Sequence, residues 1–502
     1  MARPHTTTSP TRRTACRLAK ACLFGAALIA ASPGTAAGTE AITVTVSSYV
    51  RTTPSNPEGR FKGLGVNVVG LNPGDWYEQT PAALRRRCAE LFWKDLDLAV
   101  MRFWGANGMG IDHIYTAEEI YKETHRYLED VRKVQARPPL MIYDPHSGWS
   151  SQDPNQSWSS AMTEAKLRAY IVRHADVMED LFENYGWRMD YVEITNEPEV
   201  YLAEGGWSNP ALRNKALVMT RLWREELDRR GFHSVKVLAA SRANVDADAL
   251  PTIAAFKNDP AALAAWGGYS FHSYGASMTR QIADALVGPG LDLEVVQTES
   301  GPPQQIGIAR MISDINLGTG LWLWFQAYSW DGGVGDVQPD FDGVRLAGFV
   351  HKGTAQMDIA LYPKFYFFRE VARSLPIGSR VHRCGSDKPG WPDMEFPVGQ
   401  QSPLAATAAE RPDGRWSLLA INATDDKSYY NHPYPATVLN VTFSLPHLAA
   451  AGDQPFRARL IRPDKTELDL PPLTLRDGRL TVTGLQPGEL ITLHSTNVLP
   501  KP

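Results

Sequence analysis

Two glutamates in this sequence stand where a fold could bring reactive carboxyl groups together. Glu197 directly follows the apolar run Tyr191–Asn196, and Glu299 directly follows the run Leu293–Thr298. Hydrolysis of a glycosidic bond with retention of configuration uses two carboxyl groups about 5–5.5 Å apart, one to protonate the leaving oxygen and one to attack the anomeric carbon. We therefore expect this chemistry if the fold brings the ends of the two runs together.

The two runs belong to a longer alternation of short apolar runs with amphipathic segments. A helix start is recognisable at Asn209-Pro210, where a capping side chain precedes a proline at the first helical position. Eight apolar runs are the expected strands, namely Phe61–Gly70, Leu98–Gly105, Leu140–Asp144, Tyr191–Asn196, Val235–Ala240, Tyr269–Tyr274, Leu293–Thr298 and Leu321–Tyr328. Eight strand–helix alternations predict an α/β fold, the (β/α)8 TIM barrel, whose active site lies at the C-terminal ends of the strands. Glu197 ends the fourth expected strand and Glu299 ends the seventh.

Beyond Tyr362 the pattern changes to alternating strands separated by turns. The strand-like segments are Arg415–Ala423, Ala436–Leu445, Phe456–Arg462 and Arg479–Leu485. Their alternation and close spacing predict a smaller all-β sandwich, to which the alternating segment Ile42–Val46 could add a strand. We therefore expect a strand segment over 38–60 that joins the sandwich, the catalytic barrel over 61–361 and the sandwich over 362–502.

The segment 1–37 has the layout of a cleaved secretory signal peptide. Basic residues precede the apolar run Ala21–Ala31, and small residues follow around Ala36-Ala37. The run is too short to span a bilayer, so we expect a secreted, extracellular protein. The pair Arg12-Arg13 leaves the choice between general and twin-arginine export open. The charged residues of this segment are all basic, so cleavage would make the net charge of −4 more negative. A negative net charge argues against nucleic acid and anionic membranes as partners.

The tripeptide Asn196-Glu197-Pro198, together with Glu299 at the end of the seventh expected strand, resembles the signature of the clan A glycoside hydrolases. This resemblance implies a retaining β-glycosidase that cleaves β-linked glycosides or polysaccharides through a glycosyl-enzyme. It implies that Glu197 is the acid/base and that Glu299 is the nucleophile. It also implies that Asn196 hydrogen-bonds the 2-hydroxyl of the sugar. The pair is more specific than either half, because Asn-Glu-Pro alone also occurs as a plain strand-to-loop turn.

Three further positions fit the same clan. Arg102 ends the second expected strand, and the resemblance implies that it hydrogen-bonds the nucleophile and keeps it ionised, as a neighbouring cation should. His272 and Tyr274 end the sixth expected strand, and the resemblance implies that Tyr274 contacts the nucleophile. For each of the three, an ordinary structural role is the alternative.

Additional substrate contacts are expected from two segments. The eighth expected strand places Trp324 and Gln326 on one face, so both are sugar contacts if that face looks inward. The end of the third expected strand and the loop after it carry Asp144, His146 and Trp149, which we expect to form a substrate-facing loop. Core packing for the tryptophan and a plain polar rim for the loop are the alternatives.

Within clan A the sequence is most similar to glycoside hydrolase family 30, which pairs a barrel with a β-sandwich fed by both chain ends. The likeness rests on Ile42–Ser48 leading to Gly63-Leu-Gly65, on Tyr362–Phe368 leading to Ile377-Gly378, and on Val296-Gln-Thr-Glu299. The third expected strand departs from that family, because it ends in Asp144-Pro-His-Ser-Gly-Trp149 rather than in a Trp-Ser-Pro type of sequence. Family 39 is the second choice.

The residues fit other functions less well. A non-catalytic carbohydrate-binding or adhesive protein on a glycosidase-like barrel is the main alternative, and it would need neither glutamate. A serine hydrolase needs a Gly-x-Ser-x-Gly elbow, which the barrel region lacks. Only His146 and His272 stand at strand ends as metal-type ligands, too few for a zinc site, so we expect no metal and no cofactor. For Cys88 and Cys384, a disulfide and two separate thiols both stay open.

Overall fold

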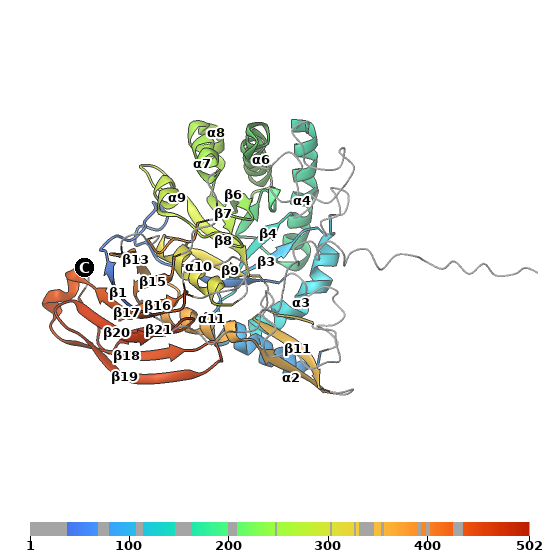
Figure 1. The fold of residues 1–502 in the computed structure, drawn as a ribbon. Coiled ribbons are helices and arrows are strands. Elements are labelled where there is room, and N and C mark those ends of the chain that lie inside the picture. The colour runs from blue at the N-terminus through green and yellow to red at the C-terminus, as the bar shows by residue number, and fades with distance from the viewer. Residues whose placement is uncertain are drawn as a thin grey trace, which may run out of the picture. The chain divides into compact units, whose positions relative to one another are not determined.

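Eight parallel strands form a closed barrel in the computed structural model (Figure 1). The order of the strands around the barrel is their order in the chain, and pairing of β2 with β9 closes the cylinder. The strands are β2 (Gly63–Asn67), β3 (Val100–Trp104), β4 (Leu140–Asp144), β5 (Tyr191–Glu193), β6 (Lys236–Arg242), β7 (Gly268–His272), β8 (Glu294–Ser300) and β9 (Leu321–Trp324). The predicted TIM barrel is therefore confirmed.

The structure describes residues 38–68, 80–106, 114–145, 162–198, 208–245, 248–301, 304–325, 328–330, 346–352, 356–388, 393–397, 402–424 and 435–500. The predicted signal peptide over 1–37 lies outside these ranges, as do His146, Trp149 and Gln326.

Helices between the strands cover the outside of the barrel (Figure 1). They are α2 (Ala82–Ala89), α3 (Ala117–Val134), α4 (Glu164–Tyr185), α6 (Pro210–Arg229), α7 (Ala249–Asn258), α8 (Pro260–Ala265), α9 (Arg280–Ala285) and α10 (Gln304–Asn316). The start of α6 follows from its sequence, because the Asn209 side chain accepts a hydrogen bond from the backbone N–H of Ala211 and Pro210 occupies the first helical position. A short π-helix, Glu90–Lys94, extends α2.

Two mainly antiparallel sheets form the sandwich, and all of their strands except β1 follow the barrel in the chain. One has the strand order β14-β1-β17-β20 and the other the order β13-β15-β16-β21-β18-β19. Their bounds are β1 (Gly38–Val46), β13 (Arg380–His382), β14 (Cys384–Ser386), β15 (Leu404–Glu410), β16 (Trp416–Asn422), β17 (Thr437–Ser444), β18 (Gln454–Ile461), β19 (Glu467–Leu475), β20 (Arg479–Leu485) and β21 (Leu490–Ser495). The N-terminal strand β1 lies between β14 and β17, so segments from before and after the barrel contribute to this sheet.

Between barrel and sandwich the chain forms elements that the sequence pattern does not predict. A three-stranded sheet consists of β10 (Tyr328–Trp330), β11 (Ala347–Lys352) and β12 (Gln356–Leu361). The residues that follow Tyr362 form helix α11 (Pro363–Ser374) rather than a strand, and this helix buries Phe365, Phe367 and Phe368. Aromatic residues have high strand propensity, but here their packing against the barrel decides for a helix.

The barrel interior is closed at its centre by an apolar layer. Val100, Ile142, Leu238, Leu321 and Leu323 belong to one cluster of buried side chains inside the cylinder. Branched aliphatic side chains of this kind fill the interior of TIM barrels, so the barrel is a packed core and not a pore. Polar groups that would act chemically must therefore stand above this layer, at the C-terminal ends of the strands.

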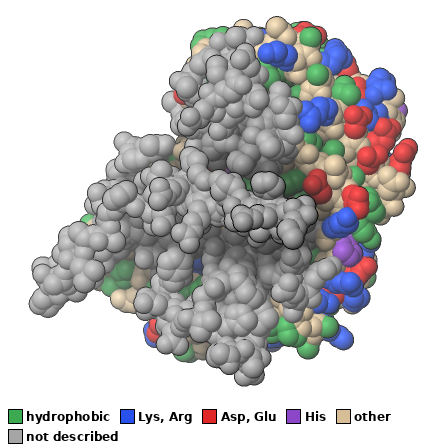
Figure 2. Space-filling view, turned by 90° about the vertical axis from the view of Figure 1, so that its right-hand side faces the viewer, with side chains coloured by type: hydrophobic (Ala, Val, Ile, Leu, Met, Phe, Trp, Pro, Cys, Tyr) green, Lys and Arg blue, Asp and Glu red, His purple; other side chains and the backbone are tan. Residues whose placement is uncertain are grey.

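On the described part of the face in Figure 2, acidic and basic side chains are interspersed. No helix within the described ranges is both long and apolar enough to cross a membrane. As for the cysteines, Cys88 and Cys384 are both buried, and no disulfide joins them among the described residues.

Candidate active site

The acidic and polar residues singled out in the sequence meet at the C-terminal end of the barrel. Asn196 and Glu197 follow β5, His272 ends β7, and Glu299 is the penultimate residue of β8. Parallel strands of a barrel end on the same face, which explains how residues far apart in sequence become neighbours. Glu197 has a φ of +41°. A non-glycine residue with a positive φ is uncommon and is held by its surroundings, as often occurs at functional sites.

The two glutamates lie close enough together to act as a catalytic pair. A carboxylate oxygen of Glu197, a carboxylate oxygen of Glu299 and a ring nitrogen of His272 all lie within 4.8 Å of one another. Glu197 is 8% exposed and Glu299 is 5% exposed, so both carboxyl groups are largely withdrawn from water. This separation suits a pair of which one carboxyl attacks the sugar directly, and it is too small for a water molecule to be activated between sugar and enzyme.

Arg102 is the centre of the hydrogen bonds beneath the pair. Its Nη1 donates to Glu299 Oε2 at 2.6 Å and to Asn67 Oδ1 at 2.9 Å. Its Nη2 donates to Asp144 Oδ2 at 2.9 Å and to Asn196 Oδ1 at 2.7 Å. The guanidinium is completely buried, and only arginine has enough planar donors to bind this many acceptors at once.

A third carboxylate completes the surroundings of Arg102. Glu193 Oε2 accepts a hydrogen bond of 2.5 Å from Arg102 Nε, and its Oε1 accepts from Ser241 Oγ at 2.8 Å and Thr298 Oγ1 at 2.9 Å. Burial acts to lower the pKa of Arg102, but the charges of Asp144, Glu193 and Glu299 outweigh burial and raise this pKa above its usual value. The guanidinium is therefore a permanent cation in contact with Glu299.

His272 contacts the other glutamate. Its Nδ1 lies 2.8 Å from Glu197 Oε1, and the ring is completely buried. Burial lowers the pKa of His272 to about 4, so the ring is neutral near neutral pH. Depending on its tautomer, a neutral imidazole nitrogen accepts a hydrogen bond from a protonated carboxyl group or donates one to a carboxylate. The contact with Glu197 is therefore compatible with both protonation states of Glu197.

Tyr274 and Asn196 complete the site. The hydroxyl of Tyr274 donates to Glu299 Oε1 at 2.8 Å. Burial, followed by the negative charges of Glu299 and Glu197, raises the pKa of Tyr274 well above its usual value, so this hydroxyl stays a donor. Asn196 uses its Oδ1 to accept from Arg102, which leaves its Nδ2 group as the donor for a ligand.

One predicted sugar contact is wrong. Trp324 is completely buried and packs against Trp322 and Phe368, with the Lys364 ammonium 5.8 Å from its ring centroid. The even-numbered face of β9 therefore points outward to α11, while Leu321 and Leu323 point into the barrel. Side chains of a strand alternate between its two faces, and sequence alone could not tell which of two apolar faces is inward.

Because the odd-numbered face of β9 points inward, another aromatic residue lies near the site. Phe325 follows β9, is partly exposed, and its ring centroid lies 6.5 Å from that of Tyr274. We did not single it out from the sequence. The predicted contacts Gln326, His146 and Trp149 lie outside the described residues.

Sequence reasoning also missed Asn67 and Glu193, and it placed Asp144 in a substrate-facing loop. Asp144 is instead completely buried at the end of β4, where it binds Arg102. A signal for Glu193 existed, because an acidic residue inside the apolar run Tyr191–Asn196 needs a buried cation or several donors. Asn67 is an uncharged polar residue inside the first run, and a buried side chain of this kind likewise needs hydrogen-bond partners.

The Glu197–His272–Glu299 group could in principle hold a metal ion, since it offers three ligand atoms within 4.8 Å. Two observations disfavour this interpretation. Two of the ligand atoms already contact each other, since His272 Nδ1 lies 2.8 Å from Glu197 Oε1, and the permanently charged Arg102 donates to Glu299 at 2.6 Å. A cation held by hydrogen bonds against one ligand opposes the binding of a second cation.

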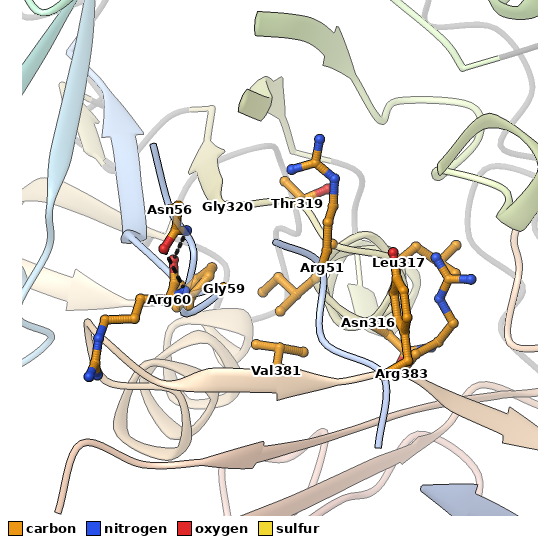
Figure 3. Close-up of a pocket in the computed structure, with 14 residues that line it drawn as sticks. Arg51, Asn56, Gly59, Arg60, Asn316, Leu317, Thr319, Gly320, Val381 and Arg383 are labelled. Carbon is orange, nitrogen blue, oxygen red and sulfur yellow. Dashed lines mark hydrogen bonds between the residues drawn. The ribbon is translucent and has the colours of Figure 1, made fainter. Parts of the chain in front are cut away.

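A separate small pocket of about 40 Å³ lies at the other end of the barrel, next to the residues that precede β2 and β9 (Figure 3). Arg51, Arg60, Thr319 and Arg383 are among the residues that line it, with Arg60 at the left and Arg383 at the right of that view. Arg51 Nη2 donates to the backbone oxygen of Leu293 at 2.7 Å. The described residues that line this pocket include no carboxylate, imidazole or thiol, and the N-terminal face of a TIM barrel serves stability. We therefore place the chemistry at the Glu197–Glu299 end.

No protein-family model matches the sequence, and no curated protein matches it. The catalytic domain of xylanase C from Talaromyces cellulolyticus, a family 30 glycoside hydrolase, superimposes with a TM-score of 0.58 at 13% identity, covering 91% of this chain and 100% of that chain. The fold is that of family 30 catalytic domains.

Two other solved structures share this family 30 fold. The subfamily 8 xylanase of Clostridium acetobutylicum gives a TM-score of 0.55 at 14% identity, covering 90% of this chain and 99% of that chain. An endo-β1,6-glucanase gives a TM-score of 0.58 at 12% identity, covering 90% of this chain and 93% of that chain. The predicted family 30 architecture, a barrel joined to a sandwich, is thus confirmed as a fold.

Proposed function

We propose that this protein is a glycoside hydrolase that cleaves β-linked glycosides or polysaccharides with retention of configuration. The observation that carries the proposal is the spacing of Glu197 and Glu299, whose carboxylate oxygens lie within 4.8 Å. Each glutamate also has its own partners, His272 for Glu197 and the cation Arg102 for Glu299. A pair of carboxyl groups held in different surroundings is what acid and nucleophile roles require.

In the first step, protonated Glu197 donates its proton to the glycosidic oxygen while Glu299 attacks the anomeric carbon. The bond to the leaving group breaks, and a covalent glycosyl-enzyme forms on Glu299. Glu197, now a carboxylate, then removes a proton from water, and the water oxygen displaces Glu299 from the anomeric carbon. Two inversions give net retention, and His272 stays in contact with Glu197 in both steps.

The surrounding residues act on charge and orientation. Arg102 holds Glu299 as a carboxylate and fixes the direction of its oxygens. Tyr274 donates to the Glu299 oxygen that Arg102 does not bind, so the attacking group is held from two sides. The Nδ2 group of Asn196 would donate to a sugar hydroxyl next to the reacting carbon, where such a bond strengthens in the transition state.

The sequence pattern of residues 1–37 supports the further proposal that the protein is exported and acts on extracellular carbohydrate. Of the three structures of similar fold named above, two are described as xylanases and one as an endo-β1,6-glucanase. These names define the substrates to try first, namely xylans and β-glucans, together with nitrophenyl β-glycosides.

The decisive experiment combines a substrate screen with one substitution. The wild-type protein should release sugar from at least one β-linked substrate, and NMR of the first-formed product should show the β-anomer. Glu299→Gln should lower kcat by at least about three orders of magnitude with the fold intact. Glu118→Gln, at an exposed position of α3, is the matched control and should keep wild-type activity.

Two outcomes would overturn the proposal. Near-normal turnover by Glu299→Gln would show that Glu299 is not the nucleophile. An α-anomer as the first product would show that the mechanism is not retaining. Binding of a polysaccharide without turnover of any substrate would favour the non-catalytic carbohydrate-binding protein instead.

A further inference from the structure

A buried carboxylate that the mechanism does not use lies directly behind the site. Asp314 of α10 is completely inaccessible to solvent. Its Oδ2 accepts hydrogen bonds from Ser273 Oγ at 2.6 Å and from Trp322 Nε1 at 2.9 Å. Its Oδ1 accepts from the backbone N–H of Met278 at 2.7 Å. A buried carboxylate with this many donors fixes the groups that donate to it, since each broken bond would leave a polar group unsatisfied.

One helical turn earlier, Arg310 holds the same segment by its carbonyl groups. Its Nη1 donates to the backbone oxygen of Tyr274, and its Nη2 donates to that of Gly275 at 3.1 Å. Residues four apart on a helix lie on the same face. Asp314 therefore binds donors and Arg310 binds acceptors of one chain segment, Ser273–Met278.

This segment carries the residues that touch both glutamates. His272, which contacts Glu197, and Tyr274, which contacts Glu299, flank Ser273. Successive side chains of an extended chain point to opposite sides. When Ser273 points outward to Asp314, its two neighbours point inward to the catalytic pair. The outward hydrogen bond of Ser273 thus sets the inward direction of His272 and Tyr274.

The position of α10 depends in turn on the sandwich side of the molecule. Ser313 Oγ donates to the backbone oxygen of Met394 at 2.8 Å. Asn316 Oδ1 accepts from the backbone N–H of Cys384 in β14 at 2.7 Å, and its Nδ2 donates to the Cys384 carbonyl at 3.1 Å. Hydrogen bonds therefore run without interruption from a sandwich strand through α10 to the segment behind the glutamates.

We propose that Asp314 and Arg310 are positioning residues: they hold Ser273–Met278 so that His272 and Tyr274 keep Glu197 and Glu299 in catalytic geometry. This inference rests on the proposed function. It also gives the sandwich a role in catalysis, because the sandwich fixes α10. Burial raises the pKa of Asp314 to about 6, against the lowering effect of its donors and of Arg310.

The first test is Asp314→Asn, which keeps the shape of the side chain but replaces one acceptor oxygen by a donor group. The kcat for an alkyl β-glycoside should fall by about 10- to 50-fold, because small misplacements of catalytic groups cost up to about 100-fold. KM should change by less than about 2-fold. The matched control is Asp130→Asn, at a buried aspartate of α3 that pairs with Arg85, and it should leave kcat unchanged.

A second readout does not depend on activity. In protein labelled with ¹⁵N-histidine, the ring resonances of His272 are assigned by their loss in His272→Gln. They should shift in Asp314→Asn and stay in place in Asp130→Asn. A folded Asp314→Asn variant with unmoved His272 resonances and wild-type kcat would overturn the proposal. If wild-type protein cleaves no glycoside but the His272 resonances shift, the proposed function fails and the positioning role stands.

A milder variant covers the case in which Asp314→Asn does not fold. Ser273→Ala removes only one donor to Asp314, and it should lower kcat by about 3- to 10-fold with the same shift of the His272 resonances. If both single variants fold, the double variant should lose less activity than the product of the two single losses, since both act through one contact. Independent, multiplicative losses would contradict the positioning role.

Discussion

Arg102 Nε and Glu193 Oε2 lie 2.5 Å apart at the centre of the barrel, and neither side chain is accessible to solvent. This contact fixes one edge of the guanidinium, while its other nitrogens bind Asp144, Asn196 and Glu299. A rotation of the guanidinium would break all of these bonds together. Glu193 therefore acts on the nucleophile through Arg102, without touching a substrate itself.

We predict that Glu193→Gln lowers kcat by about 10- to 100-fold. Arg102, Ser241 and Thr298 all donate to the Glu193 carboxylate. The amide of glutamine has a donor group in place of one acceptor oxygen, so it faces one of these donors with another donor and displaces Arg102. Steady-state kinetics on the best nitrophenyl glycoside measure the effect. Glu410→Gln, which changes a buried glutamate paired with Arg380 in the sandwich, is the control. Equal loss in both variants would show that Glu193 serves stability alone.

Glu197→Ala should separate the two chemical steps. A substrate with a good leaving group needs no proton, so a dinitrophenyl glycoside should still glycosylate Glu299, whereas water attack should become slow. Azide should then raise turnover by about 10-fold or more and yield a glycosyl azide of retained configuration. The measurements are burst kinetics and NMR of the product. Absence of both the burst and the azide product would assign the acid/base role to another residue.

The two aromatic residues at the end of β9 should differ in their effects. Trp324→Phe should destabilise the fold by about 2 kcal/mol, since it leaves a cavity against α11, without a change in KM. Phe325→Ala should raise KM by about 3- to 10-fold with little loss of stability, because Phe325 is partly exposed beside Tyr274. Urea unfolding and kinetics test the pair. A raised KM in Trp324→Phe would restore the tryptophan as a sugar contact.

Stability should fall as the pH falls below about 6.5. Burial lowers the pKa of His174 to about 3 and that of His272 to about 4. Below pH 6.5 the unfolded chain binds protons that these folded rings do not bind, so the free energy of unfolding decreases by at most about 1.4 kcal/mol per pH unit for each ring. This loss continues until the pH reaches the folded pKa.

The variant that tests the pH dependence is His174→Gln, in which one of these rings is removed. Its free energy of unfolding should vary less steeply between pH 6.5 and pH 5 than that of the wild type, although it starts lower because the contact with Tyr143 is lost. Urea titrations at each pH give both slopes. His233→Gln, at an exposed position, is the control. An unchanged slope in His174→Gln would refute this cause of acid sensitivity.

Much of the site could be predicted because strand ends are readable in the sequence. Polar residues stand at or close to the ends of several apolar runs, and in a parallel barrel all strand ends of one kind share one face. That rule is enough to bring Glu197, Glu299, Arg102 and His272 together. The same reasoning failed for Trp324, since both faces of β9 are apolar and the inward one follows only from the packing of α11.

The sequence by itself thus determined the barrel, the sandwich and the pair of glutamates, because periodicity and strand ends are local properties of the chain. Only the tertiary structure decided that Glu193 and Asn67 surround Arg102, that Phe325 faces the site, and that Asp314 holds the segment behind it. Those facts depend on side chains that are distant in sequence and satisfy one another's hydrogen bonds in a space without water. A charged residue inside an apolar run of the sequence indicates that it needs partners, but only the packed structure shows which partners it has.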